Sequence, residues 1–436
     1  MQVRIMMVSF LFQKSFREYP DSVTVRRFSP AGRMSEYSFI RAVSLPVLCA
    51  VFCIYFPLFC CGRMNCHTGI LSGVSLSMTD EPLSRTGFLF RDQAVRIADY
   101  ILSLQCSNGA VRDYPDADTV NTDSNMEYAL IGLGAAYQLT ADARYLSGMK
   151  KGISWLASEE CMSDSRWNGS WWYCYNVSGR HIACDDGAGV RDVRGVDTTS
   201  ALFVYLLYLD HRLDPDSVLA EQYRDNAVSA IDFIQKNCLD FDHLSRSSWQ
   251  MNSAGAWSVY DCKYSADQGD VYLGFHAAGL LFDSPEYESQ AEFIRECTEK
   301  TLFDKTLGRY CTSIEDGSLD RQLNSFDPIQ SQGFLPWAFG DDAAGRLSVS
   351  WLSGKVQPDG SISCYSKDPE YALSIAMLGL GENAVFGPQP VSSYRWAGTH
   401  LLDPGTGGLH DSLEGSEEDC NVAGLYITAL SKMLPF

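Results

Sequence analysis

An internal repeat constrains the fold of this chain more than any other feature of its sequence. Each repeat opens with a segment whose apolar residues recur at helical spacing on one side, runs through a loop, and closes with a segment that is apolar almost all round. Alternation of amphipathic and fully apolar helices is typical of stacked helical hairpins that bury a continuous core. The six repeats pair the segments 90–105 with 126–139, 145–158 with 197–209, 217–238 with 264–282, 286–302 with 325–339, 347–355 with 370–380, and 391–402 with 419–434.

The third repeat shows the pattern most clearly, in the segment 264–282. Ser265, Asp267 and Asp270 come before an apolar run, as is typical of a helix start, where free backbone N–H groups favour carboxylates. The run is apolar almost all round, so we expect this helix to be buried on every side. We also expect three of its small residues to touch adjacent inner helices: Gly274, Ala278 and Gly279.

The second segments of the repeats lack the polar face that an open superhelix would need, so the six hairpins are expected to close into a ring. We therefore predict an all-α fold, an (α/α)6 toroid, over residues 83–436, with the first hairpin in contact with the sixth. A ring also accommodates a chain that exceeds the usual size of one domain. It places the starts of the inner helices, and the loops before them, on one rim.

Residues 1–62 are interpreted as an N-terminal extension with a hydrophobic signal peptide or membrane anchor, and residues 63–82 as a linker. The uncharged run 42–61 is about long enough to span a bilayer. Met34 and Arg41 precede this run as in a signal peptide, so translation is expected to start at Met34 rather than Met1. The alternative is an anchor with a basic cytoplasmic tail. Both interpretations place the toroid outside the cytoplasm, secreted or tethered to the membrane.

The charge balance excludes some classes of partner. The chain carries 34 Lys and Arg against 54 Asp and Glu, a formal net charge of −20. Nucleic acids and anionic membrane surfaces both require basic patches, so neither is expected to bind the toroid. We expect a monomer that meets a membrane only through its N-terminal segment.

Cysteine and histidine spacing gives no sign of a metal or cofactor site, so we expect neither. The cysteines after Gly62 are odd in number and form no Cys-x-x-Cys pair, and the seven histidines are dispersed. One loop carries three cysteines that could form a disulfide in an oxidising compartment: Cys161, Cys174 and Cys184. Three histidines of the rim loops are further acid–base candidates: His181, His243 and His410.

Six helical hairpins, long loops rich in Trp and Tyr, and acids at the starts of inner helices together resemble the six-hairpin glycosidase superfamily, over residues 83–436. A smaller resemblance, in the segments 102–109 and 356–361, is to the terpenoid cyclase and prenyltransferase toroids. Class II cyclases carry an Asp-x-Asp-Asp motif, whereas Asp116-Ala-Asp118-Thr119 lacks the last Asp. No equivalent of the prenyltransferase zinc site occurs either, so cyclase chemistry is the weaker alternative.

The first resemblance implies glycosidic cleavage by two carboxyl groups, one protonated and one ionised. We favour Asp197 and Asp267 as catalytic residues, with Asp270 next, because they begin the most apolar helices after the most aromatic loops. Each acid could instead be a helix cap, and the loop aromatics could simply close the mouth of the toroid. The candidate substrate-binding residues are Asp123, Glu127, Trp167, Trp171, Trp172, Arg194, Trp249, Trp257, Asp327 and Trp337.

The sequence therefore predicts an exported carbohydrate-active enzyme, a glycoside hydrolase acting on a polysaccharide or glycoconjugate. Arg194 beside the acids suggests a uronate, because guanidinium groups pair with carboxylates. A polysaccharide lyase or epimerase, and a non-catalytic carbohydrate-binding envelope protein, are the alternatives. We expect the rim acids Asp123, Asp197, Asp267 and Asp327 to line one cavity beneath Trp171, Trp172 and Trp257, with at least one raised carboxyl pKa, and Asp267 or Asp270 in the closest pair.

Overall fold

A computed structural model describes residues 81–436 of the chain, apart from residues 188, 323–326, 363–370, 388–389 and 414–417. Of residues 81–89 and 327–328 it describes the backbone alone. The predicted extension, the signal or anchor segment and almost all of the linker lie outside the described residues. Within the described part of the chain, no helix combines the length and the apolar character needed to cross a bilayer.

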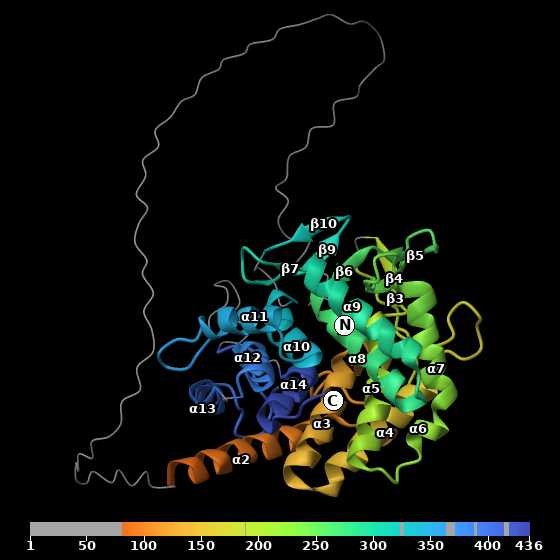
Figure 1. The fold of residues 1–436 in the computed structure, drawn as a ribbon. Helices are drawn as coiled ribbons and strands as arrows, with labels where there is room; N and C mark the ends of the chain where they lie inside the picture. The colour runs from red at the N-terminus through yellow and green to blue at the C-terminus, as the bar shows by residue number, and fades with distance from the viewer. Residues whose placement is uncertain (1–80, 188, 323–326, 363–370, 388–389, 414–417) are drawn as a thin grey trace, which may run out of the picture. The chain divides into compact units, whose positions relative to one another are not determined.

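The described chain is built from helices that alternate between an outer and an inner layer (Figure 1). The outer helices are α2 (Glu81–Leu104), α4 (Ala143–Glu159), α7 (Arg224–Phe233), α9 (Pro285–Thr301), α11 (Ala343–Ser353) and α13 (Val391–His400). The short α6 (Leu219–Gln222) precedes α7, and a π-helical turn, η1 (Ile234–Cys238), follows it. The inner helices are α3 (Asn125–Thr140), α5 (Asp197–Leu213), α8 (Ser265–Phe282), α10 (Asp327–Phe339), α12 (Tyr371–Val385) and α14 (Cys420–Ser431).

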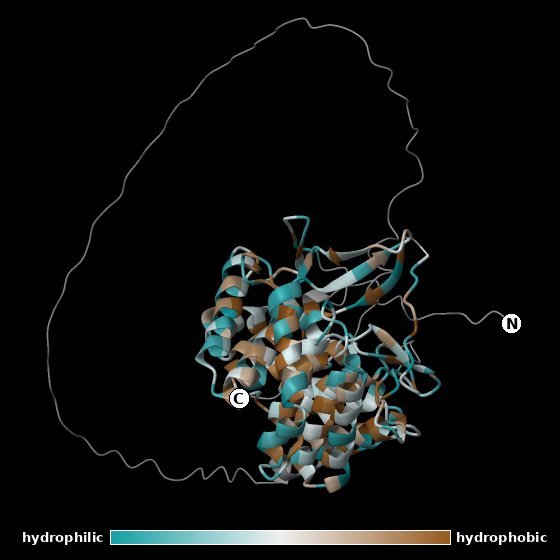
Figure 2. Ribbon diagram, turned by 90° about the vertical axis from the view of Figure 1, so that its right-hand side faces the viewer, coloured by the Kyte–Doolittle hydropathy of each residue, from teal (hydrophilic) through white to brown (hydrophobic). Residues whose placement is uncertain are grey.

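Burial follows the sequence pattern of each layer. In α3 every residue from 126 to 136 is buried, and α8 is buried from 265 to 279 apart from Asp267 and His276. The outer α9 buries only Ala291, Ile294 and Thr298. The hydropathy colours of the ribbon show teal segments on helices at the surface and brown segments among the helices toward the interior (Figure 2). The prediction of alternating amphipathic and all-round apolar helices is confirmed.

The inner helices form a closed ring, since each contacts the next and α14 contacts α3. Glycines allow the close approach at several of these contacts. A Cβ atom on Gly132 would lie 2.5 Å from the Cα of Gly424, and one on Gly274 would lie 2.6 Å from the Cα of Ala201. The predicted (α/α)6 toroid, the contact between the first and sixth hairpins, and the contact of Gly274 with an adjacent inner helix are confirmed.

The expectation for Gly279 is wrong. A Cβ atom there would meet the side chain of Glu288 at 2.6 Å, and Glu288 belongs to the outer helix α9. The reason is geometric, because residues five apart on a helix point to different sides and α8 packs against both layers. Ala278 is fully buried, as expected for an inner helix.

Short antiparallel sheets, which the sequence analysis treated as loops, extend the rim segments. Strands β1 (Thr119–Asn121) and β2 (Cys174–Asn176) pair with each other, as do β7 (Phe303–Asp304) and β8 (Arg309–Tyr310). Two three-stranded sheets run in the order β3-β4-β5 (Val190–Arg194, Ser248–Asn252, Trp257–Tyr260) and β10-β9-β6 (Ser318–Asp320, Ser313–Glu315, Cys262–Tyr264). Strand β3 leads into α5 and strand β6 into α8, so these two strands fix where those helices begin.

The opposite ends of the inner helices are covered by the C-terminal residues. Phe436 packs against the rings of Tyr205 and Tyr272 at 5.9 and 6.4 Å, and the indole N–H of Trp337 donates to the Met433 carbonyl at 2.7 Å. Arg212 donates to the carbonyl of Pro435 at 2.7 Å. The tail therefore joins three neighbouring inner helices, α5, α8 and α10.

A buried carboxyl group next to β1 makes a prediction about pH. Asp113 is 8% exposed, and its oxygens accept hydrogen bonds from the Asn121 N–H and the Thr119 hydroxyl. Burial raises its pKa from 3.8 to about 6 despite these bonds. Because the folded pKa is the higher one, the protonated group stabilises the fold. This contribution is complete below the unfolded pKa and is lost as the pH rises through about 6.

We expect the free energy of unfolding of Asp113→Asn, relative to the unmodified chain, to increase by about 3 kcal/mol between pH 3 and pH 8. Denaturant titrations across this range measure it. Asp142→Asn is the control. Hydrogen bonds from Arg144 and its charge lower the Asp142 pKa, so the stability of Asp142→Asn relative to the unmodified chain should change with pH in the opposite direction. A constant difference for Asp113→Asn would contradict the prediction.

Candidate active site

Carboxyl groups from three neighbouring inner helices meet at the rim. Asp123 lies just before α3 and Glu127 in its first turn, Asp197 is the first residue of α5, and Asp270 lies near the start of α8. Glu127 and Asp197 are fully buried, Asp270 is 1% exposed, and Asp123 is half-buried. These four acids, which we call the mouth carboxyls, influence one another electrostatically, as their pKa shifts show.

Thr198 connects the first two helices at this point. Its hydroxyl donates to Asp123 Oδ1 at 3.2 Å, and its backbone N–H donates to Asp197 Oδ1 at 2.9 Å. The backbone N–H of Asp197 in turn donates to the carbonyl of Ser247 at 3.0 Å. One threonine therefore holds two carboxyl groups from different hairpins in a fixed relation.

Asp270 is held by a hydrogen-bonded chain that crosses the ring. The Tyr128 hydroxyl donates to the Asp270 carboxyl group, with O–O distances of 2.8 and 3.0 Å, and accepts from the Gln330 amide at 3.1 Å. The three side chains come from α8, α3 and α10. Tyr128 and Gln330 were missed by the sequence analysis, because nothing near them in the sequence marks a bond to a residue on another hairpin.

The surroundings of the buried mouth carboxyls favour their protonated forms. Burial raises the pKa of Glu127 well above its ordinary value, and the charges of Asp123 and Asp270 raise it further. Both Glu127 oxygens are buried without a hydrogen-bond partner among the described residues. Such a group is stable only when neutral or when a ligand reaches it. The expectation of a raised carboxyl pKa at the rim is confirmed.

Asp197 and Asp270 are shifted in the same direction. Burial raises the Asp197 pKa well above its ordinary value, the Asp123 charge adds to this, and the hydrogen bond from the Thr198 N–H offsets part of it. For Asp270 burial again dominates, the Tyr128 hydrogen bond opposes it, and the charges of Asp197 and Asp123 add to it. Asp123 is thus the charge that all three buried groups share.

For the other two predicted rim acids, Asp267 and Asp327, the structure gives less detail about their position relative to the mouth carboxyls. Asp267 is half-buried in the first turn of α8, and its charge contributes to the raised pKa of Tyr128, next to Asp270. The backbone of Asp327 begins α10, but its side chain lies outside the described residues. The structure therefore brings together Asp123, Asp197 and Asp270 of the predicted acids, and Glu127 with them. Which two carboxyl groups approach most closely stays a prediction.

An aromatic cluster lies beside the mouth carboxyls. Trp167 packs edge-on against Trp249 and Trp257, with ring centroids 5.7 and 5.3 Å apart, and Trp257 lies 6.0 Å from Trp172. Trp167 is 6% exposed, while the other three are half-buried. Much of this aromatic surface therefore covers the mouth of the toroid itself, and only Trp172, Trp249 and Trp257 keep exposed edges.

Two residues that were predicted to bind substrate, Trp171 and Trp337, do not lie at the rim. Trp171 is 1% exposed, and its indole N–H donates to the Leu156 carbonyl at 2.7 Å, so it belongs to the core. Trp337 is 2% exposed and bonds to Met433 at the far end of the ring. It lies ten residues along α10, about 15 Å from the helix start. The expected roof over the acids therefore lacks Trp171.

Arg194 lies within the aromatic cluster, at the end of β3. Its guanidinium carbon lies 4.3 Å from the Trp172 ring centre and 5.0 Å from that of Trp167. The side chain is 8% exposed, its Nε has no hydrogen-bond partner, and no described carboxylate forms an ion pair with it. Trp172 also stacks on His181, which pairs with Asp192 at 3.0 Å. A desolvated guanidinium without a carboxylate partner is suited to bind an anionic group.

The described cysteines, including Cys161, Cys174 and Cys184, are free thiols. The disulfide considered for this loop is therefore absent from the described structure.

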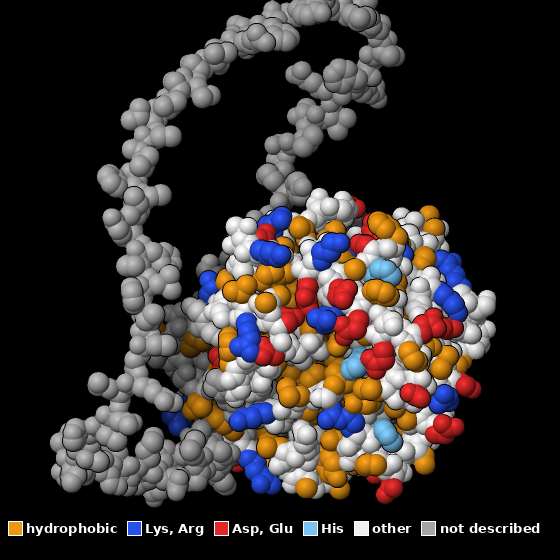
Figure 3. Space-filling model, viewed as in Figure 1, with side chains coloured by type: hydrophobic (Ala, Val, Ile, Leu, Met, Phe, Trp, Pro, Cys, Tyr) orange, Lys and Arg blue, Asp and Glu red, His pale blue; other side chains and the backbone are white. Residues whose placement is uncertain are grey.

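On the face seen in Figure 3, basic side chains are interspersed with acidic ones rather than gathered in one patch.

The closed ring of six helical hairpins is an (α/α)6 toroid, and solved structures share this fold. A D-mannose isomerase matches with a TM-score of 0.59 at 10% identity, over 82% of this chain and 99% of that one. A structure described as a glycosidase in complex with glucose matches with a TM-score of 0.54 at 13% identity, over the same shares.

The α-1,6-mannanase GH76A of Salegentibacter sp. HEL1_6 matches with a TM-score of 0.52 at 13% identity, over 79% of this chain and 98% of that one. An inactive variant of it, solved in complex with α-1,6-mannotetrose, matches with a TM-score of 0.53. The sequence matches no protein-family model, and a search of curated proteins gives no significant match. At these identities the likeness establishes the fold, and residue roles have to come from this chain's own geometry.

Proposed function

We propose that this protein is a carbohydrate-active enzyme, a glycoside hydrolase that cleaves a polysaccharide or glycoconjugate at the rim of the toroid. One observation carries the proposal: three buried carboxyl groups and the half-buried Asp123 lie together at the rim, beside half-buried tryptophans. Structural carboxyl groups are usually exposed or paired with cations. A cluster of buried acids without cationic partners among the described residues destabilises a fold and is typically retained for chemistry. The named activities of the structural neighbours support the same class.

Asp197 and Asp123 are the proposed acid and base. Asp197 is fully buried and its pKa is raised, so it stays protonated and can donate to the leaving oxygen. Asp123 is half-buried, the most accessible of the mouth carboxyls, and is therefore assigned as the ionised partner. It acts as nucleophile or activates water, and the substrate lies between the two. This assignment replaces Asp267 by Asp123 as the partner of Asp197.

The remaining mouth carboxyls have supporting roles in this proposal. Asp270, hydrogen-bonded to Tyr128 and through it to Gln330, is held in place beside the proposed acid and base and has a positioning role. The unpaired oxygens of Glu127 are available to sugar hydroxyl groups. Asp267, predicted from the sequence as catalytic, is instead assigned to substrate binding at the start of α8.

Arg194 makes an acidic sugar the proposed substrate class. Its guanidinium lies between two tryptophans, three residues before Asp197. Two hydrogen bonds from Thr122 connect the Trp172 segment to the loop that carries Asp123. The Thr122 hydroxyl donates to the Trp172 carbonyl at 2.6 Å, and the Thr122 N–H donates to the Tyr173 carbonyl at 3.1 Å. A uronate carboxylate could therefore pair with Arg194 while the tryptophan edges contact the sugar ring.

The test is turnover on a panel of neutral mannans and uronate-containing glycans. We expect new reducing ends from the uronate glycans, with Arg194→Gln lowering kcat/KM about 10- to 100-fold on these substrates and much less on neutral ones. Arg166→Gln is the matched control, since Arg166 also lies over Trp167, at 4.7 Å, but is exposed. Equal losses for both substrate classes would refute the acidic substrate and leave the hydrolase. Unsaturated products would instead indicate a lyase.

The D-mannose isomerase match favours a second candidate, an isomerase or epimerase of a free sugar. Such an enzyme moves a proton between neighbouring carbons, which also needs a carboxyl group of raised pKa. Incubation with monosaccharides in deuterated water distinguishes the two. An isomerase incorporates deuterium into the sugar without changing its length, whereas a hydrolase leaves monosaccharides unchanged.

Export is part of the proposal and rests on the sequence of residues 42–61 alone. Fractionation of cells that express the full chain tests it. Recovery of the toroid in the cytoplasm would exclude export.

A further inference from the structure

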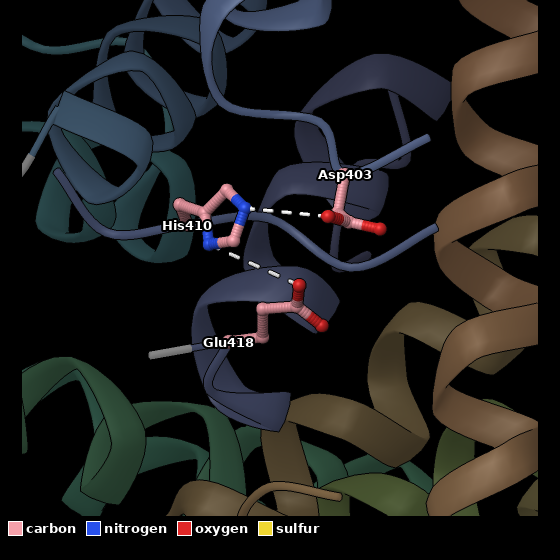
Figure 4. A group of neighbouring side chains, drawn as sticks. All are labelled: Asp403, His410 and Glu418. Carbon is pink, nitrogen blue, oxygen red and sulfur yellow. Dashed lines mark ion pairs between the residues drawn. The ribbon is translucent and has the colours of Figure 1, made fainter. Parts of the chain in front are cut away.

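A second group of polar side chains lies on the segment between α13 and α14, apart from the proposed active site. Asp403, His410 and Glu418 each offer a ligand atom, and these atoms all lie within 4.8 Å of one another. Figure 4 shows the His410 ring between the two carboxylates, with one ring nitrogen facing each of them. The three residues are seven and eight positions apart in the sequence, which matches no metal-binding motif, so the sequence alone does not mark the group.

The distances within this group exceed those of hydrogen bonds. His410 Nε2 lies 3.6 Å from Asp403 Oδ2, and His410 Nδ1 lies 3.8 Å from Glu418 Oε1. Nδ1 is buried and has no hydrogen-bond partner in the part of the chain that the structure describes. One ring nitrogen binds one ion, so these two distances do not belong to a single coordination sphere. With one nitrogen of His410 and one oxygen of each carboxylate, the three ligand atoms lie within 4.8 Å of one another. Ligand atoms about 2.1 Å from a shared tetrahedral ion are about 3.4 Å apart, so the imidazole would turn and the carboxylates would move inward by about 1 Å on binding.

Both carboxylates are oriented by other hydrogen bonds. Asp403 Oδ1 accepts from the N–H groups of Gly405 and Thr406 at 2.7 Å each, which leaves Oδ2 facing the imidazole. The Thr406 hydroxyl donates to Glu418, with distances of 2.9 and 3.1 Å to its two oxygens. Bonds of this kind to ligating carboxylates are a regular part of metal sites.

His410, which carries a charge only when protonated, is the one basic side chain among the described residues that pairs with these carboxylates. The Glu418 side chain is 6% exposed, and no described Lys or Arg forms an ion pair with it or with Asp403. Burying a carboxylate without a compensating positive charge is costly. A divalent cation would supply that charge, and the 25–29% exposure of His410 and Asp403 leaves it a path from solvent.

We propose that Asp403, His410 and Glu418 bind one divalent transition-metal ion, of which zinc is the best match to one imidazole and two carboxylates, with water completing the coordination. Its role is structural. Glu418 lies two residues before α14, and its carbonyl accepts a hydrogen bond from Tyr100 of α2, so the ion would fix the segment where the sixth hairpin meets the first. The proposal is independent of the proposed function.

The test uses the purified chain, stripped with a chelator, incubated with zinc and desalted. We expect about one equivalent of zinc and a Tm that rises with zinc concentration. Asp403→Asn and Glu418→Gln keep side-chain size, and each should weaken zinc binding at least tenfold, as should His410→Ala. Circular dichroism establishes that each variant folds.

Two control variants guard against zinc bound elsewhere. His211→Ala removes an exposed histidine and Cys184→Ser a buried thiol, and both should retain the zinc. Zinc that is retained by Glu418→Gln but lost by Cys184→Ser would overturn the proposal in favour of thiol binding. A chain that retains no zinc after desalting and shows no change in Tm would overturn it as well.

Discussion

Replacing Asp197 by Asn is expected to lower turnover about 10²- to 10⁴-fold while substrate binding changes little, because the proton donor is lost and the shape is kept. Asp197 is fully buried, and burial raises its pKa well above the ordinary value, which favours the protonated form that a proton donor needs. The amide can mimic that protonated group in binding but cannot release a proton. Steady-state kinetics and binding to an uncleaved oligosaccharide measure the two effects separately.

A pH profile shows whether Asp197 acts as an acid or only supports the site. The unmodified enzyme should lose kcat/KM at high pH as the donor ionises, and residual activity in Asp197→Asn should lack that limb. Glu160→Gln is the matched control. Glu160 is also a buried acid, with a pKa that burial raises to about 8, but it lies at the end of the outer helix α4 and is not one of the mouth carboxyls. If Glu160→Gln lost as much activity as Asp197→Asn, the loss would reflect buried charge in general, and the assigned role would be wrong.

Replacing Gly424 by Ala is expected to destabilise the fold by about 3 kcal/mol or more, because the ring cannot close around an added methyl group. A Cβ atom on Gly424 would lie 2.1 Å from the backbone oxygen of Tyr128, and helix backbones cannot move aside as side chains do. In an unhindered helix the same change stabilises by up to about 1 kcal/mol. Thermal unfolding should show a Tm lower by roughly 5 °C or more.

Gly354→Ala provides the comparison. A Cβ atom there would meet its nearest neighbours, the Ser350 and Trp351 carbonyl oxygens, at 3.4 Å, so its effect should stay within about 0.5 kcal/mol. Because Gly424 and Tyr128 belong to the contact of α14 with α3, an unchanged Tm for Gly424→Ala would mean that the ring is not closed there.

The fold could be predicted from the sequence because its main signal is local. A helix that is apolar all round, such as 271–282, has to be buried wherever it lies, and its small residues imply close neighbours. Which neighbour each residue meets is not local information. Gly274 contacts an inner helix and Gly279 an outer one, although both lie in the same apolar run.

The site was predictable only in part for the same reason. Acids at helix starts mark the rim, and Asp123, Asp197 and Asp270 do come together there. The bond from Tyr128 to Asp270 spans 142 residues, and no sequence spacing reveals it. Trp171 and Trp172 are neighbours in the sequence, yet one is in the core and the other reaches the rim, because successive side chains of an extended segment point to opposite sides.

The contact of α14 with α3 has a consequence for synthesis of the protein. Cys420 of α14 lies against Asn125 of α3, 295 residues earlier in the chain. While the chain emerges from the ribosome, one apolar side of α3 has no neighbour until residues 420–431 are available. The first hairpins can form early, but each partial ring exposes an apolar seam that favours association with other chains. Formation of the toroid is therefore a late event, and chaperone binding to nascent chains should persist until the sixth hairpin has emerged.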